Sequence, residues 1–164
     1  MSKKVFLKGT LILACTGLVS RIAGFFYRIF LSHAIGAEGL GLYQLILPLQ
    51  GLMAALSYTG IQSALSRLIA SRLALQEKKE AYFSLVTGIF AAVFFSAVTG
   101  FLLFRHADFF ASTILKAPGT SDLLRLTAAS IPLCAIHSCI DSYYYARKKA
   151  SVPAAVQLLS LIHI

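Results

Sequence analysis

The sequence predicts an all-α protein that crosses a membrane several times. The chain has 164 residues, of which 58% are hydrophobic and only 13% are charged, and its mean hydropathy is +0.79. An ordinary soluble domain carries about twice that share of charge. Residues 39–66 and 81–104 contain no Asp, Glu, Lys or Arg. Each of these stretches exceeds the roughly 20 residues that a helix needs to span a bilayer.

The first expected span, residues 9–32, holds the most unusual residues of the chain. Arg21 lies near its midpoint and Arg28 follows seven residues later, on the same helix face and about 10.5 Å away. An arginine at the centre of a spanning helix costs roughly 2.5–3.5 kcal/mol. Gly17 and Gly24 share the arginine face, whereas the opposite side is apolar. We therefore expect the arginine face to line protein or a water-filled cavity.

A short loop is expected after the first span. Residues 33–42 include Gly36, Gly39 and Gly41, and glycines allow a tight reversal of the chain. No Lys-Ser or Lys-Thr pair follows these glycines, so the loop lacks the pattern of a phosphate-binding loop. We expect the three glycines to serve backbone geometry.

The second expected span covers residues 43–72. It contains Pro48, which removes one backbone hydrogen bond and favours a kink. Gln44 and Gln50 are polar positions in the same span. They are candidates for lining a cavity, although hydrogen bonding between helices is the commoner use of such residues.

The rest of the chain predicts two more full spans and a partial one. The full spans are residues 81–104 and 123–146, and residues 107–117 read as a short amphipathic segment at the membrane interface. The fifth span, residues 151–164, is too short to cross a bilayer unaided. Residues 159–164 read like one frame of a transposon-derived sequencing adapter, so we expect a non-native tail there and a gene that continues. A genuine short C-terminus is the alternative.

Lysine and arginine are unevenly distributed between the two sides of these spans. Ten lie before the first span, between the second and third, and after the fourth, whereas three lie on the other side. The positive-inside rule then places the N-terminus in the cytoplasm. The net charge of +9 is accordingly interpreted as a topology signal, and no nucleic-acid partner is expected.

The composition gives little support to catalysis or metal binding. Cys15, Cys134 and Cys139 fall in apolar spans without metal-ligand spacing, which is typical of small packing residues. The four histidines are scattered. The sequence shows no Ser/His/Asp set, paired carboxylates or nucleotide-binding loop, so we expect neither an enzyme nor a bound cofactor.

Three segments carry a resemblance to a known family: KGTLIL at residues 8–13, VSRIAGFFYRI at 19–29 and IGAEGLGLY at 35–43. They resemble the amino-terminal end of the stage V sporulation protein B and polysaccharide-exporter family, within the multidrug/oligosaccharidyl-lipid/polysaccharide superfamily. The resemblance implies a multidrug-exporter-like bundle of about fourteen helices in two halves around a cavity. Residues 1–158 would supply the first four helices and part of the fifth, and the missing helices of the same polypeptide would be their partners.

The resemblance also implies a function in the bacterial cell membrane. Members would move an undecaprenyl-pyrophosphate-linked oligosaccharide, such as a peptidoglycan precursor, to the outer leaflet by alternating access. In the related lipid II flippases, arginines of the first helix line the cavity. Arg21, in Ser20-Arg-x-x-Gly-Phe, matches the first of them, and Arg28 lies four residues after Gly24, where the Gram-negative branch has a spacing of three. Arginine suits this role because it stays charged and offers phosphate a planar fork of donors.

Other interpretations of the same residues stay open. Arg21 and Arg28 would be structural charges if they paired with Asp141 or with helix carbonyls, and Asp141 is also a candidate partner for Arg147. The chain could instead belong to a cation-coupled multidrug exporter of the same superfamily, although two cavity-facing arginines repel cations. A third class is a non-transporting membrane scaffold for envelope or spore-coat assembly.

Overall fold

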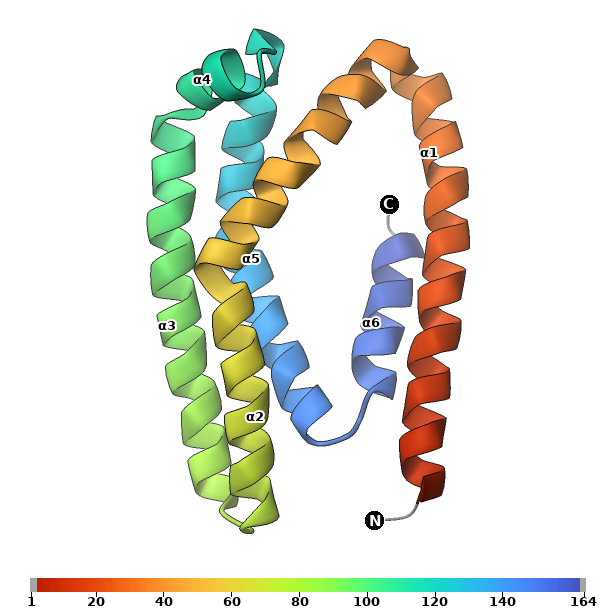
Figure 1. Ribbon diagram of the computed structural model, residues 1–164, viewed down its shortest axis with the longest axis vertical. Coiled ribbons are helices and arrows are strands. Elements are labelled where there is room, and N and C mark those ends of the chain that lie inside the picture. Colours follow the sequence, from red (N-terminus) through yellow and green to blue (C-terminus); the bar gives the residue numbers. More distant parts are fainter. Residues whose placement is uncertain (1–2, 163–164) are drawn as a thin grey trace.

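The computed structural model describes the backbone of residues 3–162 and the side chains of residues 10–159. Every element in the described part of the chain is helical, and the long helices run up and down between two ends of the molecule (Figure 1). The elements are α1 Lys3–Ala54, a π-helical segment Ala55–Thr59, α2 Gly60–Ala74, α3 Lys78–Arg105, α4 Ala107–Phe109, a second π-helical segment Phe110–Ile114, a 3-10 turn Pro118–Thr120, α5 Ser121–Ala146 and α6 Ser151–Ile162. The predicted all-α class is confirmed.

Within the described part of the chain, three helical stretches are long and apolar enough to cross a membrane: Thr10–Ala74, Lys78–Arg105 and Pro118–Ala146. Large apolar side chains lie on their outer surfaces, with Phe90 73% and Leu126 71% exposed. A surface of this kind is costly in water but matches the apolar interior of a bilayer. The structure therefore agrees with the predicted class of membrane protein.

A break at Gly36 divides α1 into two limbs that run in opposite directions (Figure 1). The backbone of Gly36 has φ 73° and ψ 173°, a combination that is essentially restricted to glycine. The prediction of a loop over residues 33–42 is wrong, because helix continues on both sides of Gly36. One residue without a Cβ atom is sufficient to reverse the chain, so Gly39 and Gly41 stay helical in the second limb.

The second limb of α1 passes Pro48 with helical backbone angles. The chain changes direction further on, at the π-helical segment Ala55–Thr59 that joins α1 to α2 (Figure 1). A π-helical turn widens the helix and disturbs the regular hydrogen-bond ladder, which is a recognised cause of a bend. The bend expected at Pro48 is therefore displaced towards α2.

Helices α2, α3 and α5 form the packed core together with the second limb of α1. Most of the buried apolar side chains among the described residues form two clusters. One contains Ile46, Leu49, Met53, Leu103, Ala107, Ala111, Leu124, Ala128 and Ile131, and the other contains Leu65, Ile69, Ala81, Ala92, Ala135, Cys139 and Ala146. At Gly100 a Cβ atom would lie 2.9 Å from the carbonyl oxygen of Ala128, so glycine lets α3 and α5 approach closely.

The first limb of α1 stands apart from this core and has α6 beside it (Figure 1). Thr16, on the side that is packed, is only 7% exposed. The start of α1, the α2–α3 connection and the α5–α6 connection lie at one end of the molecule, whereas α4 and the reversal between the two limbs of α1 lie at the other (Figure 1). The basic segments that the sequence assigns to one side of the membrane are thus at the same end. Residues 1–2 of the basic arm and residues 163–164 of the expected tail lie outside the described residues.

Candidate functional site

The two arginines of the first limb line one hollow on α1. Its volume is about 450 Å³, and Arg21, Gly24, Phe25 and Arg28 line it together with Ser20. Both arginine side chains are exposed. No atom lies within 4 Å of the position that a Cβ atom of Gly24 would occupy, so the space beside the guanidinium groups is open. The structure therefore brings together Arg21, Arg28 and Gly24, as the helical spacing indicated.

Neither arginine is neutralised by a carboxylate within the described part of the chain. The ion pairs there involve Arg72 with Glu77, Arg125 with Asp108 and Asp122, and His137 with Asp141. A guanidinium that has no acidic neighbour keeps its donors available to an anion. The hollow is thus suited chemically to phosphate oxygens.

Asp141 takes a different partner from those considered in the sequence. Its Oδ2 lies 3.5 Å from Nδ1 of His137, one turn earlier on α5. Arg147, the other candidate partner, donates to the hydroxyl of Tyr143 at 3.2 Å and lies over that ring at 5.4 Å from its centroid. The interpretations in which Asp141 pairs with Arg21, Arg28 or Arg147 are therefore wrong for this structure.

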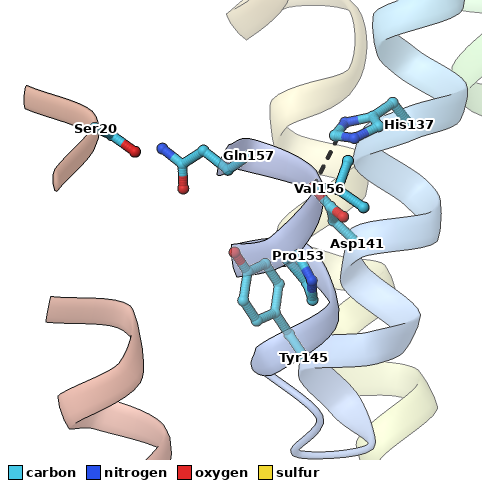
Figure 2. A pocket seen from close by; sticks show the side chains of 7 residues that line it. All are labelled: Ser20, His137, Asp141, Tyr145, Pro153, Val156 and Gln157. Atoms are coloured by element: carbon cyan, nitrogen blue, oxygen red, sulfur yellow. Dashed lines mark ion pairs between the residues drawn. The ribbon is translucent and has the colours of Figure 1, made fainter. Parts of the chain in front are cut away.

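A second and larger hollow lies between α1, α5 and α6 (Figure 2). Its volume is about 640 Å³, and its lining residues are Ser20, His137, Asp141, Tyr145, Pro153, Val156 and Gln157. Figure 2 shows Gln157 of α6 directed towards Ser20 of α1, with the paired side chains of His137 and Asp141 on α5. Ser20 lines both hollows, so the two spaces adjoin at this residue.

Ser20 has an unusual environment at this junction. Its Oγ atom is buried and has no hydrogen-bond partner among the described residues. A buried hydroxyl without a partner loses the hydrogen bonds that it makes with water. Ser20 is thus a polar group that a ligand at the junction is able to satisfy.

The other residues singled out in the sequence lie elsewhere. Gly17 is on the first limb with open space beside it, and it lines neither of the two hollows. The remaining ones form the helix break or belong to the second limb: Gly36 at the break, and Gly39, Gly41, Gln44, Pro48 and Gln50 after it. None of these lines either hollow. Gln44 is exposed and Gln50 is half-buried.

Sequence reasoning missed the polar residues of the second hollow. His137, Tyr145 and Gln157 were not candidates, although His137 and Asp141 stand four residues apart in an apolar stretch, a spacing that places them on one helix face. Among the residues whose side chains are described, no group of three or more His, Cys, Asp or Glu could hold a metal ion.

Comparison with known proteins gives two matches. Residues 6–160 match the family described as polysaccharide biosynthesis protein. The chain is also similar to stage V sporulation protein B of Bacillus subtilis (strain 168), with 32% identity over 167 residues, covering 99% of this chain and 31% of the relative. No solved structure matches. The chain thus spans about a third of the length of that curated relative.

Proposed function

The chain belongs to the polysaccharide biosynthesis protein family, and from this premise we propose that it is part of a membrane flippase. Its cargo is an undecaprenyl-pyrophosphate-linked oligosaccharide, which it helps to carry from the inner to the outer leaflet of the bacterial cell membrane. The name of the relative, a stage V sporulation protein, supports a role in building the envelope of a spore. The protein acts as a transporter rather than an enzyme, by alternating access of a cavity to the two sides.

One observation carries this proposal: Arg21 and Arg28 line the same hollow in an apolar helix without an acidic partner among the described residues. Moving a pyrophosphate through a membrane requires cations that replace its water, and the apolar surroundings strengthen their attraction. Arginine supplies a permanent charge and two parallel donors for each phosphate group. The polyprenyl tail of the cargo stays in lipid beside the exposed apolar surface of the helices.

The two ends of the fold support an orientation for the proposed flippase. The start of α1 and the two basic connections lie at one end (Figure 1), and Lys and Arg accumulate on the cytoplasmic side of membrane proteins. This arrangement supports the proposal of a multi-pass protein with a cytoplasmic N-terminus and with the Gly36 reversal at the outer side. Membrane lipids surround it.

A multidrug exporter for cations is the weaker alternative. Two guanidinium groups that line one space, without an acidic partner in the part of the chain described, repel a cationic drug and attract an anion. A membrane scaffold needs no charged hollow within its apolar helices, where each arginine is costly. Neither alternative explains why Arg21 lies within an apolar helix, where its charge is costly.

The test is binding of the sugar-free lipid to the chain reconstituted in lipid nanodiscs. Undecaprenyl pyrophosphate and undecaprenol share the tail and differ in the two phosphates. We expect Arg21→Ala to weaken binding of undecaprenyl pyrophosphate by roughly ten- to a hundred-fold, the range for a lost hydrogen bond to a charged group. Arg21→Lys is expected to lose less, because it keeps the charge without the fork.

The matched control is Arg67→Ala, which removes an exposed arginine of α2 outside both hollows. It is expected to bind like the wild type, and undecaprenol is expected to bind all variants equally. In cells depleted of their flippase, Arg21→Ala in the full-length protein is expected to abolish rescue at normal membrane levels. Wild-type binding and full rescue by Arg21→Ala would refute the proposal.

A further inference from the structure

The hollow between α1, α5 and α6 adjoins the hollow lined by Arg21 and Arg28, here called the arginine hollow, but its lining has different chemistry. Its polar lining consists of the carboxylate of Asp141, the imidazole of His137, the phenol of Tyr145 and the amide of Gln157, with the Ser20 hydroxyl at the junction. These groups are a mixture of donors and acceptors. Such a mixture suits a neutral molecule that carries many hydroxyl and amide groups.

We infer that this hollow is a subsite for the first sugar residues of the lipid-linked oligosaccharide. The inference rests on the proposed function, because it places the sugar beside a pyrophosphate held by Arg21 and Arg28. Sugar hydroxyls donate to the Asp141 carboxylate and to the Gln157 carbonyl oxygen, and they accept from the Gln157 amide. The Ser20 hydroxyl, which is buried without a partner in the described residues, bonds the group that joins the sugar to the phosphate.

The order of the two hollows matches the order of groups in the cargo. Arg28 lies towards the Gly36 end of the first limb of α1, whereas Tyr145 lies close to the end of α5 that leads into the basic α5–α6 connection (Figure 1). A lipid-linked sugar in the inner leaflet presents its tail, pyrophosphate and sugar in that order from the membrane centre to the cytoplasm. The arginine hollow therefore receives the phosphates, while the second hollow receives the groups nearer the cytoplasm.

The size and geometry favour a sugar over a bare cation. A volume of about 640 Å³ lies within the roughly 300–1,000 Å³ of small-molecule sites. A bare cation requires several ligand atoms converging at about 2–2.6 Å. The polar groups here come from three helices around an open space (Figure 2), and no metal-holding cluster occurs among the described side chains.

His137 has a positioning part in this subsite. Its ring nitrogen lies 3.5 Å from the Asp141 carboxylate, whose side chain is 19% exposed. The contact restrains Oδ2 of a carboxylate that lines the hollow. A restrained acceptor binds a hydroxyl at a lower cost in conformational entropy than a free side chain does.

The experiment measures the affinity of the full chain in nanodiscs for two probes that differ only in the sugar. These are undecaprenyl pyrophosphate and undecaprenyl-pyrophosphoryl-N-acetylglucosamine. We expect the wild type to bind the sugar-bearing lipid about ten-fold more tightly, the gain from one or two new hydrogen bonds. Asp141→Asn, Tyr145→Phe and Gln157→Ala are each expected to move this ratio towards one and to leave the affinity for the sugar-free lipid unchanged.

Two control variants separate the possible outcomes. Asp122→Asn makes the same carboxylate-to-amide change at an exposed position of α5 outside both hollows, and it is expected to keep the wild-type ratio. Arg21→Ala is expected to weaken both lipids equally. Gln157 is exposed, so its truncation tests the subsite even if Asp141→Asn fails to fold.

A wild-type ratio of one would overturn the sugar subsite and leave the pyrophosphate proposal standing. The subsite is also wrong if Gln157→Ala and Tyr145→Phe keep the wild-type ratio. If the wild type binds neither lipid, the pyrophosphate proposal and the sugar subsite both fail.

Discussion

The carboxylate of Asp141 lies 3.5 Å from the imidazole of His137 on the same face of α5. This contact removes Asp141 as a neutralising partner for Arg21 and Arg28 on α1. The sequence left that pairing open, and it would have made the arginines structural charges. With Asp141 held on α5, the two arginines line a cationic hollow that no carboxylate of the described residues compensates, as an anion-binding site requires.

Arg28→Ala is expected to weaken binding of undecaprenyl pyrophosphate in the same direction as Arg21→Ala. Both side chains line one hollow, so under the proposed function both would contact the same pyrophosphate, and each loss is expected to be roughly ten-fold or more. Equilibrium binding in nanodiscs measures the effect, with Arg67→Ala as the control. An Arg28→Ala variant that binds like the wild type would show that Arg28 instead extends to the membrane surface.

Gly36→Ala is expected to destabilise the fold by about 1–3 kcal/mol. Its φ of 73° and ψ of 173° lie in a backbone region that is strained for residues with a Cβ atom. Gly41→Ala is the control, because Gly41 is helical and has no atom within 4 Å of its added Cβ. Thermal unfolding in detergent, followed by circular dichroism, measures both. Equal melting temperatures for the two variants would contradict the strain at Gly36.

The long helices of the fold were predictable from the pattern of apolar residues. The uncharged stretches at residues 39–66 and 81–104 indicated helices, and the structure has α-helix through most of both. The residue at which the chain reverses was not predictable, because Gly36, Gly39 and Gly41 are all able to adopt a positive φ. The structure gives the positive φ to Gly36 and keeps the other two glycines helical.

The candidate site was predictable in part for a similar reason. The seven-residue spacing of Arg21 and Arg28 is local, so helix geometry alone places them on one face. Ser20 and Gln157 are far apart in the sequence and line one hollow only because α6 lies beside the first limb of α1. The helical periodicity of each segment does not indicate that α6 packs beside the first limb of α1.

Gly100→Ala is expected to destabilise the contact between α3 and α5. The added Cβ would lie 2.9 Å from the carbonyl oxygen of Ala128, and backbone cannot move aside as easily as a side chain. Overpacking of this kind costs about 1–3 kcal/mol. Gly51→Ala, with open space around the new Cβ, is the control and is expected to melt at the wild-type temperature or slightly above. A Gly100→Ala protein as stable as Gly51→Ala would refute the close approach.

Leu124→Ala and Leu126→Ala are expected to differ although the residues are near neighbours on α5. Leu124 is fully buried in the core cluster, whereas Leu126 is 71% exposed. Truncating the buried side chain leaves a cavity and costs about 2–5 kcal/mol. Truncating Leu126 removes contacts with lipid that other apolar contacts with lipid replace, so the cost in stability is small. Chemical unfolding in detergent measures both, and equal costs would contradict the placement of α5.

Arg125→Ala is expected to loosen the segment between α3 and α5 without much effect on global stability. The Arg125 guanidinium bonds Asp108 at 2.9 Å and Asp122 at 3.0 Å, so it connects α4 to the start of α5. All three side chains are substantially exposed, and pairs of this kind contribute about 0.2–1 kcal/mol. Amide hydrogen exchange should therefore accelerate in residues 107–114 while the melting temperature stays nearly constant.

The control variant is Arg105→Ala. It removes a nearby exposed arginine that has no ion pair in the described chain, and it should leave that exchange unchanged. Equal exchange rates in the two variants would mean that apolar packing of Ala107 and Ala111 alone holds the segment.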